Sequence, residues 1–236
     1  MSLNQSDDEE RGVEIVPNKL RQHSRLAQNE DESSMSTSSG ITFRNRQEID
    51  VIDYITAGCL ILSAIFFFSG AGMSRIHTMS TYGTMYLLFS VCYIPHTAYH
   101  VALVKEHGKK RIFIKSLNFI AGTMYFLGAC CALGNNLMGF SSLWIVAALL
   151  NFIEFTLELM EYIRMDDRPL LKLLEKSIGV LTSILIIAAS SSKIDAYTGH
   201  IGNFTAKYEL GTDLFLAAAV FHALYSVLAV LDMFTV

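Results

Sequence analysis

From residue 51 to the C-terminus, six apolar stretches alternate with short segments that are richer in polar residues. A helix needs roughly 20 mainly apolar residues to cross the ~30 Å hydrocarbon core of a bilayer, and most of the stretches reach that length. The fifth is shorter, so its helix either continues back through Leu170–Leu174 or crosses with little tilt. The pattern predicts an all-α polytopic membrane protein with six transmembrane helices, at residues 51–71, 81–104, 112–133, 140–163, 177–192 and 212–234.

The first 50 residues differ in composition from the rest of the chain. They hold 10 of the 22 acidic residues and 6 of the 18 basic ones, with few large apolar side chains. Such a segment buries too little apolar surface to offset the entropy lost on ordering, which is typical of disorder. It also lacks the apolar region of a signal peptide, so the first predicted helix has to insert the chain. The chain is therefore predicted to divide into a disordered cytosolic tail, 1–50, and a membrane domain, 51–236.

Basic residues are unevenly shared between the two sets of connecting segments. The segments after the second and fourth predicted helices hold nine: Lys105, Lys109, Lys110, Arg111, Lys115, Arg164, Arg168, Lys172 and Lys176. The opposite segments hold three: Arg75, Lys193 and Lys207. Because cytosolic loops carry the excess of Lys and Arg, both termini are predicted to be cytosolic, in a plasma membrane or an endolysosomal or other endomembrane. The motif Asn203-Phe204-Thr205 then faces outward, which predicts a glycoprotein with its glycan on Asn203, although the sixth helix begins nearby.

The predicted helices repeat in pairs. Small residues of the first helix, Ala57-Gly58, Ala64 and Gly70, align at a constant offset of 64 with Ala121-Gly122, Gly128 and Gly134 of the third. The even helices align through polar residues: His96 and His100, Glu154 and Glu158, then His222 and Ser226. Small residues let helices approach closely in lipid. The chain thus resembles three tandem helical hairpins, and such repeats are frequent in transporters.

One of these hairpins carries a more specific pattern. An apolar helix with Gly58 and Ser63-Ala64 is followed by Thr81-Tyr82-Gly83-Thr84, which opens the next helix. On these residues the segment from Tyr54 to His100 resembles the YrhK-type two-helix membrane module. The resemblance implies a membrane protein of uncharacterised role and assigns no chemistry to any residue.

Five ionisable residues of the even helices are predicted to form one polar intramembrane layer: His96, His100, Glu154, Glu158 and His222. Residues four apart share one helix face, and the three helices place these groups at similar depths. A charged side chain at a helix centre costs about 2.5–3.5 kcal/mol, so such groups need partners or a function. Pro95 directly precedes His96 and predicts a kink, which acts as a hinge or as a static bend.

Three interpretations of the layer remain open at this point. The His and Glu side chains can lock the helices together, or they can carry protons or small cations, with glutamates as carriers and histidines as relays. A metal or haem site is the third, because imidazole and carboxylate suit several metals and His96 with His222 can serve as axial ligands. No hydrolytic zinc motif, nucleophile triad or phosphate loop is present, so we expect neither an enzyme nor a cofactor.

The working hypothesis is a small transporter-like or channel-like protein for protons or small cations, and the alternative is a non-catalytic membrane organiser or adaptor. Expected partners are the lipid bilayer, a proton or small cation, a second copy of the chain, and sorting adaptors. No nucleic-acid partner is expected. Sorting adaptors are expected because Asp166, Leu170 and Leu171 fit an acidic dileucine signal, which an adaptor binds as an extended peptide. An amphipathic turn leading into the fifth helix explains the same residues.

Overall fold

A computed structural model describes residues 51–76, 78–104, 108–165, 169–199 and 204–234. The predicted tail, Asp166 and Asn203 lie outside these residues. Every regular element in the described part is helical, and it contains no strand. The six helices are α2 (Val51–Met73), α3 (Met79–Leu103), α4 (Lys109–Leu133), α5 (Leu137–Ile163), α6 (Leu170–Thr198) and α7 (Phe204–Phe234).

The prediction of six helices is confirmed, but several are longer than hydropathy indicated. The fifth predicted helix does continue back through Leu170–Leu174, because α6 begins at Leu170 directly after Pro169. Proline has no N–H to leave unpaired at a helix start. The last helix starts at Phe204, eight residues before its apolar stretch. There Lys207 pairs with Asp195 of α6 at 2.6 Å, so polar residues extend both helices.

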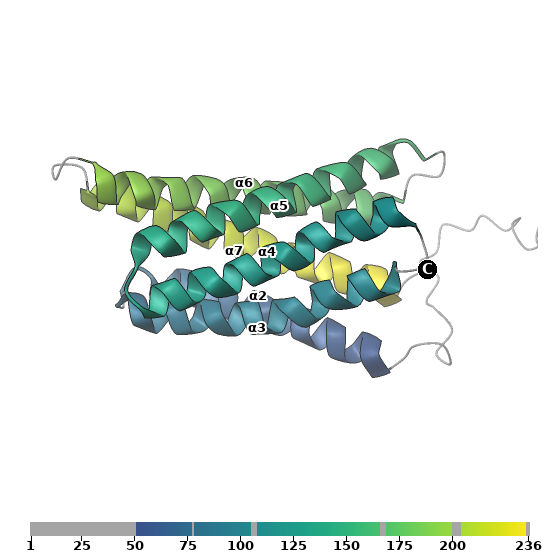
Figure 1. Cartoon of the computed structure of the whole chain (residues 1–236), viewed down its shortest axis with the longest axis horizontal. Helices are drawn as coiled ribbons and strands as arrows, with labels where there is room; N and C mark the ends of the chain where they lie inside the picture. Colours follow the sequence, from purple (N-terminus) through teal and green to yellow (C-terminus); the bar gives the residue numbers. More distant parts are fainter. Residues whose placement is uncertain (1–50, 77, 105–107, 166–168, 200–203, 235–236) are drawn as a thin grey trace, which may run out of the picture. The chain divides into compact units, whose positions relative to one another are not determined.

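The helices form a closed ring of contacts. Each helix packs along the helices before and after it in the chain, and α2 also packs along α7. Figure 1 shows the helices running lengthwise beside one another. Consecutive helices are joined by no more than six residues, which makes neighbours antiparallel. Side chains that point inward from any helix therefore meet those of the other helices inside the ring.

An aromatic cluster fills the middle of this ring. Its centre is Trp144, the single tryptophan of the chain, which is fully buried. Six other rings have centroids 4.7–5.9 Å from Trp144: Phe67, Tyr86, Phe89, Tyr125, Phe140 and Phe215. These rings come from five of the six helices. Together with Trp144 these rings form what we call the Trp144 cluster, and they pack against one another in the middle of the ring.

Outward-facing side chains are apolar on all six helices. Examples are Leu62 and Phe68 on α2, Leu88 and Val91 on α3, Ile120 and Leu127 on α4, Leu149 and Ile153 on α5, Leu181 and Ile184 on α6, and Leu224 and Val227 on α7. Four helices, α2, α4, α5 and α7, are long and apolar enough to cross a membrane. An apolar outer surface of this kind is characteristic of an integral membrane protein, because water would not tolerate so large a patch.

Glycines allow close approach at some of the predicted positions and not at others. A methyl group on Gly128 of α4 would lie 2.4 Å from Trp144 Cδ1, and one on Gly70 of α2 would lie 2.7 Å from Tyr86. A methyl group on Gly58 would instead have no neighbouring atom within 4 Å. The small-residue pattern therefore marks helix contacts at Gly70 and Gly128 but not at Gly58, which faces outward.

Replacing Gly128 with Ala should destabilise the protein by about 1–3 kcal/mol, because the added methyl group overpacks the Trp144 cluster. The matched control is Gly58→Ala, which adds the same methyl group in open space and should be neutral or slightly stabilising. Thermal unfolding of the detergent-solubilised protein, followed by the fluorescence of Trp144, measures both. Equal stability of the two variants would contradict the close packing of α4 on α5.

Candidate functional site

Both predicted glutamates lie inside the ring, where they bind lysines. Lys115 of α4 has its Nζ 3.1 Å from Oε1 of Glu154 and 2.5 Å from Oε1 of Glu158. Lys176 of α6 lies 3.0 Å from Oε2 of Glu158 and 2.6 Å from Oε1 of Glu175. These five side chains form a continuous chain of ion pairs, which we call the Lys–Glu layer. Glu158 lies at its centre because it contacts both amines.

Helix geometry explains why these residues meet. Glu154 and Glu158 are one turn apart on the inner face of α5, and α5 packs between α4 and α6. Lys115 and Lys176 are each the seventh residue of their helices, so each reaches α5 from one side. The charge count places both lysines among the residues of connecting segments, although Lys115 falls within the predicted helix 112–133. That placement is wrong, because α4 begins at Lys109 and α6 at Leu170, so both lysines lie inside helices.

The layer is deeply buried. Glu154 is 0% exposed, and Glu158, Glu175 and Lys176 are all below 8%. A buried charge is costly to desolvate, and an ion pair compensates only where the geometry is good. Here two amines face three carboxylates at 2.5–3.1 Å, so each carboxylate has an amine beside it. The second oxygen of Glu154, Oε2, has no hydrogen-bond partner among the described residues.

The three predicted histidines form a separate group. His96 is fully buried, and neither of its ring nitrogens has a hydrogen-bond partner in the described part of the chain. Its ring centroid lies 4.5 Å from that of His100. His222 Nε2 lies 3.3 Å from Ser63 Oγ. The ring of Tyr93 neighbours two of the histidines, with its centroid 6.2 Å from that of His96 and 5.8 Å from that of His222.

A small cavity lies between His222 of the histidine group and Asn151 of α5. It has a volume of about 20 Å³ and is lined by Tyr93, Asn151, Ser183, His222 and Tyr225 among others. A space of this size holds about one water molecule. Asn151 lies one turn before Glu154 on α5, and the Tyr93 hydroxyl donates to Asn118 Oδ1 at 2.8 Å. The cavity therefore gives a polar connection between the glutamate helix and His222.

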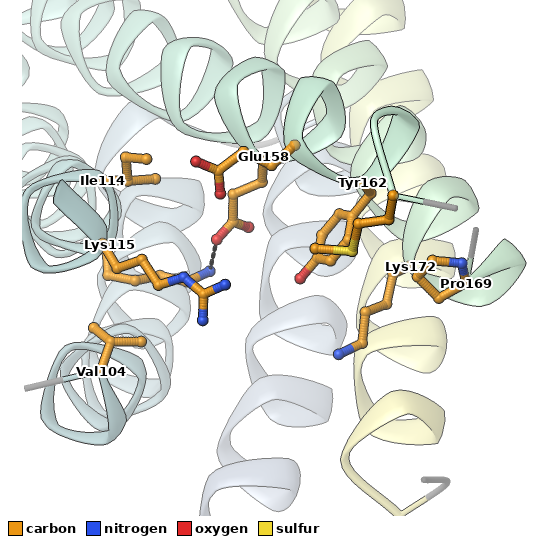
Figure 2. Close-up of a pocket in the computed structure, with 10 residues that line it drawn as sticks. Val104, Ile114, Lys115, Glu158, Tyr162, Pro169 and Lys172 are labelled. Atoms are coloured by element: carbon orange, nitrogen blue, oxygen red, sulfur yellow. Dashed lines mark ion pairs between the residues drawn. The ribbon is translucent and has the colours of Figure 1, made fainter. Parts of the chain in front are cut away.

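The Lys–Glu layer opens toward one end of the ring. A pocket of about 320 Å³ is lined by Arg111, Lys115, Glu158, Tyr162 and Lys172, with apolar residues at its edge. We call it the mouth pocket. Figure 2 shows the ion pair between Lys115 and Glu158 at its wall, with Tyr162 and Lys172 across from it. Toward the other end, Phe67 and Phe89 of the Trp144 cluster each contact the ring of His222 at 5.5 Å.

A third lysine amine inside the ring lies beyond the Trp144 cluster. Lys193 of α6 is fully buried, and its Nζ has no hydrogen-bond partner among the described residues. Three aromatic rings surround it, with centroids 5.4, 4.8 and 4.9 Å from Nζ: Tyr82, Tyr208 and Phe215. Such rings attract a cation through their faces. Sequence analysis placed Lys193 in an outer segment, and the structure instead buries it inside α6.

The metal and haem interpretations gain no support from this geometry. The described residues contain no group of three or more His, Cys, Asp or Glu side chains arranged to hold a metal ion. The ring of Tyr93 neighbours both His96 and His222, and the cavity beside His222 is far smaller than a haem. The described contacts support the other two interpretations, a structural lock and a path for protons or cations.

The remaining predicted sites are only partly described. Pro95 lies inside α3, which continues through it from Met79 to Leu103, and its role as a hinge stays a prediction. Leu170 and Leu171 form the first turn of α6, with Leu170 79% exposed, so binding as an extended peptide requires that turn to unwind.

No protein-family model, curated protein or solved structure matches this chain.

Replacing Lys115 with Met should destabilise the protein by about 3–5 kcal/mol, because it leaves buried carboxylates without their cation. Adding Glu154→Gln and Glu158→Gln to this variant should restore part of the loss. The control is Lys110→Met, which breaks the exposed ion pair with Glu161 and should cost no more than about 1 kcal/mol. Thermal unfolding in detergent measures all three, and similar losses for Lys115 and Lys110 would contradict the buried layer.

Proposed function

We propose that the chain is an integral membrane protein in which all six helices cross the bilayer, and that the Lys–Glu layer with His96, His100 and His222 carries protons or small cations. The support for six crossings concerns α3 and α6, which are not among the four helices that length and composition alone mark as able to cross a membrane. Their polar residues point into the ring, as His96 and Lys193 do, whereas Val91 and Ile184 face outward. Because each lies antiparallel between membrane-spanning neighbours, a crossing is the arrangement that keeps these contacts.

The proposed orientation places the mouth pocket on the cytosolic side. Lys176 is buried and Lys115 is partly buried, both lie inside helices in ion pairs, and neither counts as a loop charge, which reduces nine basic residues to seven. Lys193 leaves the opposite set for the same reason, which reduces three to two. The excess remains large, and it favours cytosolic termini in a plasma membrane or an endomembrane.

The observation that carries the transport proposal is a buried acid–base layer with access from one end. The mouth pocket reaches Lys115 and Glu158, while the Trp144 cluster closes the ring beyond His222. Carriers expose a central ionisable site to one side of the membrane at a time. Glutamate, lysine and histidine side chains inside a membrane are typical of proton relays. Protons are therefore the favoured cargo, and small cations the next.

A second function, that of a membrane organiser or adaptor, is favoured by a different observation. Glu154, Glu158 and Glu175 each have an amine partner, and the aromatic rings of five helices close around Trp144. A bundle fixed in this way can display its surfaces to partners without moving anything through its centre. The two functions differ in whether the layer has to change its protonation state.

Cysteine labelling tests the six crossings. In a variant without its native cysteines, we expect Ile76→Cys and Lys109→Cys to react with a membrane-impermeant maleimide from opposite sides, because α3 separates them. Arg164→Cys and Tyr197→Cys should likewise react from opposite sides, because α6 separates them. Labelling within either pair from one side would show that the helix between them does not cross.

Proton flux in proteoliposomes tests transport. Glu154→Gln should leave the fold intact, as judged by Trp144 fluorescence, and should abolish a pH-driven flux that the unchanged protein supports. The control is Glu161→Gln, which removes a carboxylate two turns further along α5 in the exposed pair with Lys110 and should retain the flux.

Three outcomes decide between the two functions. Loss of flux in the folded Glu154 variant alone supports transport. No flux in the unchanged protein, together with reduced stability of the Glu154 variant, favours the organiser. Equal flux in all three proteins would mean that the layer is not on the path.

A further inference from the structure

The mouth pocket has the size and location of a ligand site. Its volume of about 320 Å³ falls at the lower end of the range for small-molecule pockets, roughly 300–1,000 Å³. It lies where the end of α3, the start of α4, the end of α5 and the start of α6 come together, with lining residues such as Val104, Ile114, Met165 and Pro169. Figure 2 shows Val104, Ile114 and Pro169 around a space that Lys115 and Glu158 of the Lys–Glu layer border on one side.

Positive charge in the pocket exceeds what its own carboxylates neutralise. Three cations line it: Arg111, Lys115 and Lys172. Its two carboxylates are already paired, since Glu158 binds Lys115 and Lys176 and Glu161 binds Lys110 at 2.5 Å. Arg111 makes no ion pair with any described residue, and Lys172 has one described carboxylate partner, Asp232 at 3.7 Å, besides the ring of Tyr162 at 5.7 Å. An anion can therefore bind two cations here without breaking the buried layer.

The surroundings favour an anion attached to an apolar group. Val104, Ile114 and Met165 line the pocket beside its cations. Large apolar side chains on the adjoining helix ends are exposed, among them Phe113 of α4 at 62% and Ile163 of α5 at 48%. Basic pockets between helices at the membrane boundary bind phospholipid head groups. Arginine, moreover, presents a planar set of donors that matches phosphate oxygens.

We propose that the mouth pocket binds the phosphate-bearing head group of an anionic phospholipid, with Arg111 and Lys172 on the phosphate and the acyl chains along Phe113 and Ile163. A soluble phosphate ester shares the phosphate chemistry but lacks the chains. The proposal concerns binding alone and holds whether or not the layer carries protons. Lys115 belongs to the Lys–Glu layer and also lines the mouth pocket, so a phosphate bound there lies next to the ion pair between Lys115 and Glu158.

The test measures binding to the full chain in detergent. The probe is a short-chain phosphatidylinositol phosphate, titrated while Trp144 fluorescence reports the unfolding temperature. Short-chain phosphatidylcholine and free inositol phosphate are titrated in parallel. We expect saturable stabilisation by the phosphoinositide and none by phosphatidylcholine.

Variants assign the site. Arg111→Gln and Lys172→Gln should each weaken phosphoinositide binding about tenfold or more, because each removes a charge-assisted hydrogen bond. Lys109→Gln is the matched control, since Lys109 lies two residues from Arg111 on the same helix, outside the pocket lining. It should change the affinity by less than about threefold, as expected for a screened surface charge.

The outcomes separate the sources of phosphate. Equal binding of inositol phosphate, with the same loss in the Arg111 variant, would keep the phosphate site but replace the lipid with a soluble ligand. Binding of phosphatidylcholine as strong as that of the phosphoinositide would overturn the proposal. So would unchanged affinity in both folded pocket variants. If one variant fails to fold, the other decides.

Discussion

The double ion pair of Glu158 is the constraint on which the other features of the site depend. Helices in lipid gain little from burying apolar surface against one another, because the acyl chains are equally apolar. Polar contacts and close packing therefore have to hold them. Glu158 joins α5 to α4 through Lys115 and to α6 through Lys176. Loss of either amine leaves the charge of Glu158 partly unpaired inside α5, which packs between α4 and α6. One carboxylate therefore holds three of the six helices together.

The Trp144 cluster divides the interior into two unlike ends. On one side lie three carboxylates, two amines and the histidine group, next to the mouth pocket. On the other side Lys193 has aromatic rings for neighbours and no carboxylate partner among the described residues. Any passage through the ring has to displace these aromatic side chains. The cluster therefore separates the Lys–Glu layer from the Lys193 end, where Tyr208 also lines a pocket of about 450 Å³.

Much of the fold could be predicted from the sequence, and the partners within the site could not. Apolar stretches locate the six helices, four of which are long and apolar enough to cross a bilayer. Hydropathy fails at the helix ends, where Lys115 and Lys176 continue a helix through ion pairs rather than through apolar residues. The two glutamates are predictable, because carboxylates are rare in such helices. Their lysine partners count as loop charges in the sequence, and the one signal that could identify them is that two buried carboxylates need cations. Small-residue spacing likewise could not separate Gly128 from Gly58, since it does not say which face meets a neighbour.

A lock and a proton path place different demands on the two glutamates, and their surroundings differ accordingly. Glu158 has an amine at each oxygen, so protonating it disrupts two pairs. Glu154 has one amine, at 3.1 Å, and its second oxygen has no hydrogen-bond partner in the described part of the chain. A proton can bind that oxygen while Lys115 keeps its shorter contact with Glu158, 2.5 Å. In the proposed path Glu154 is therefore the group that changes protonation, and Glu158 is the one that holds the helices together while it does so.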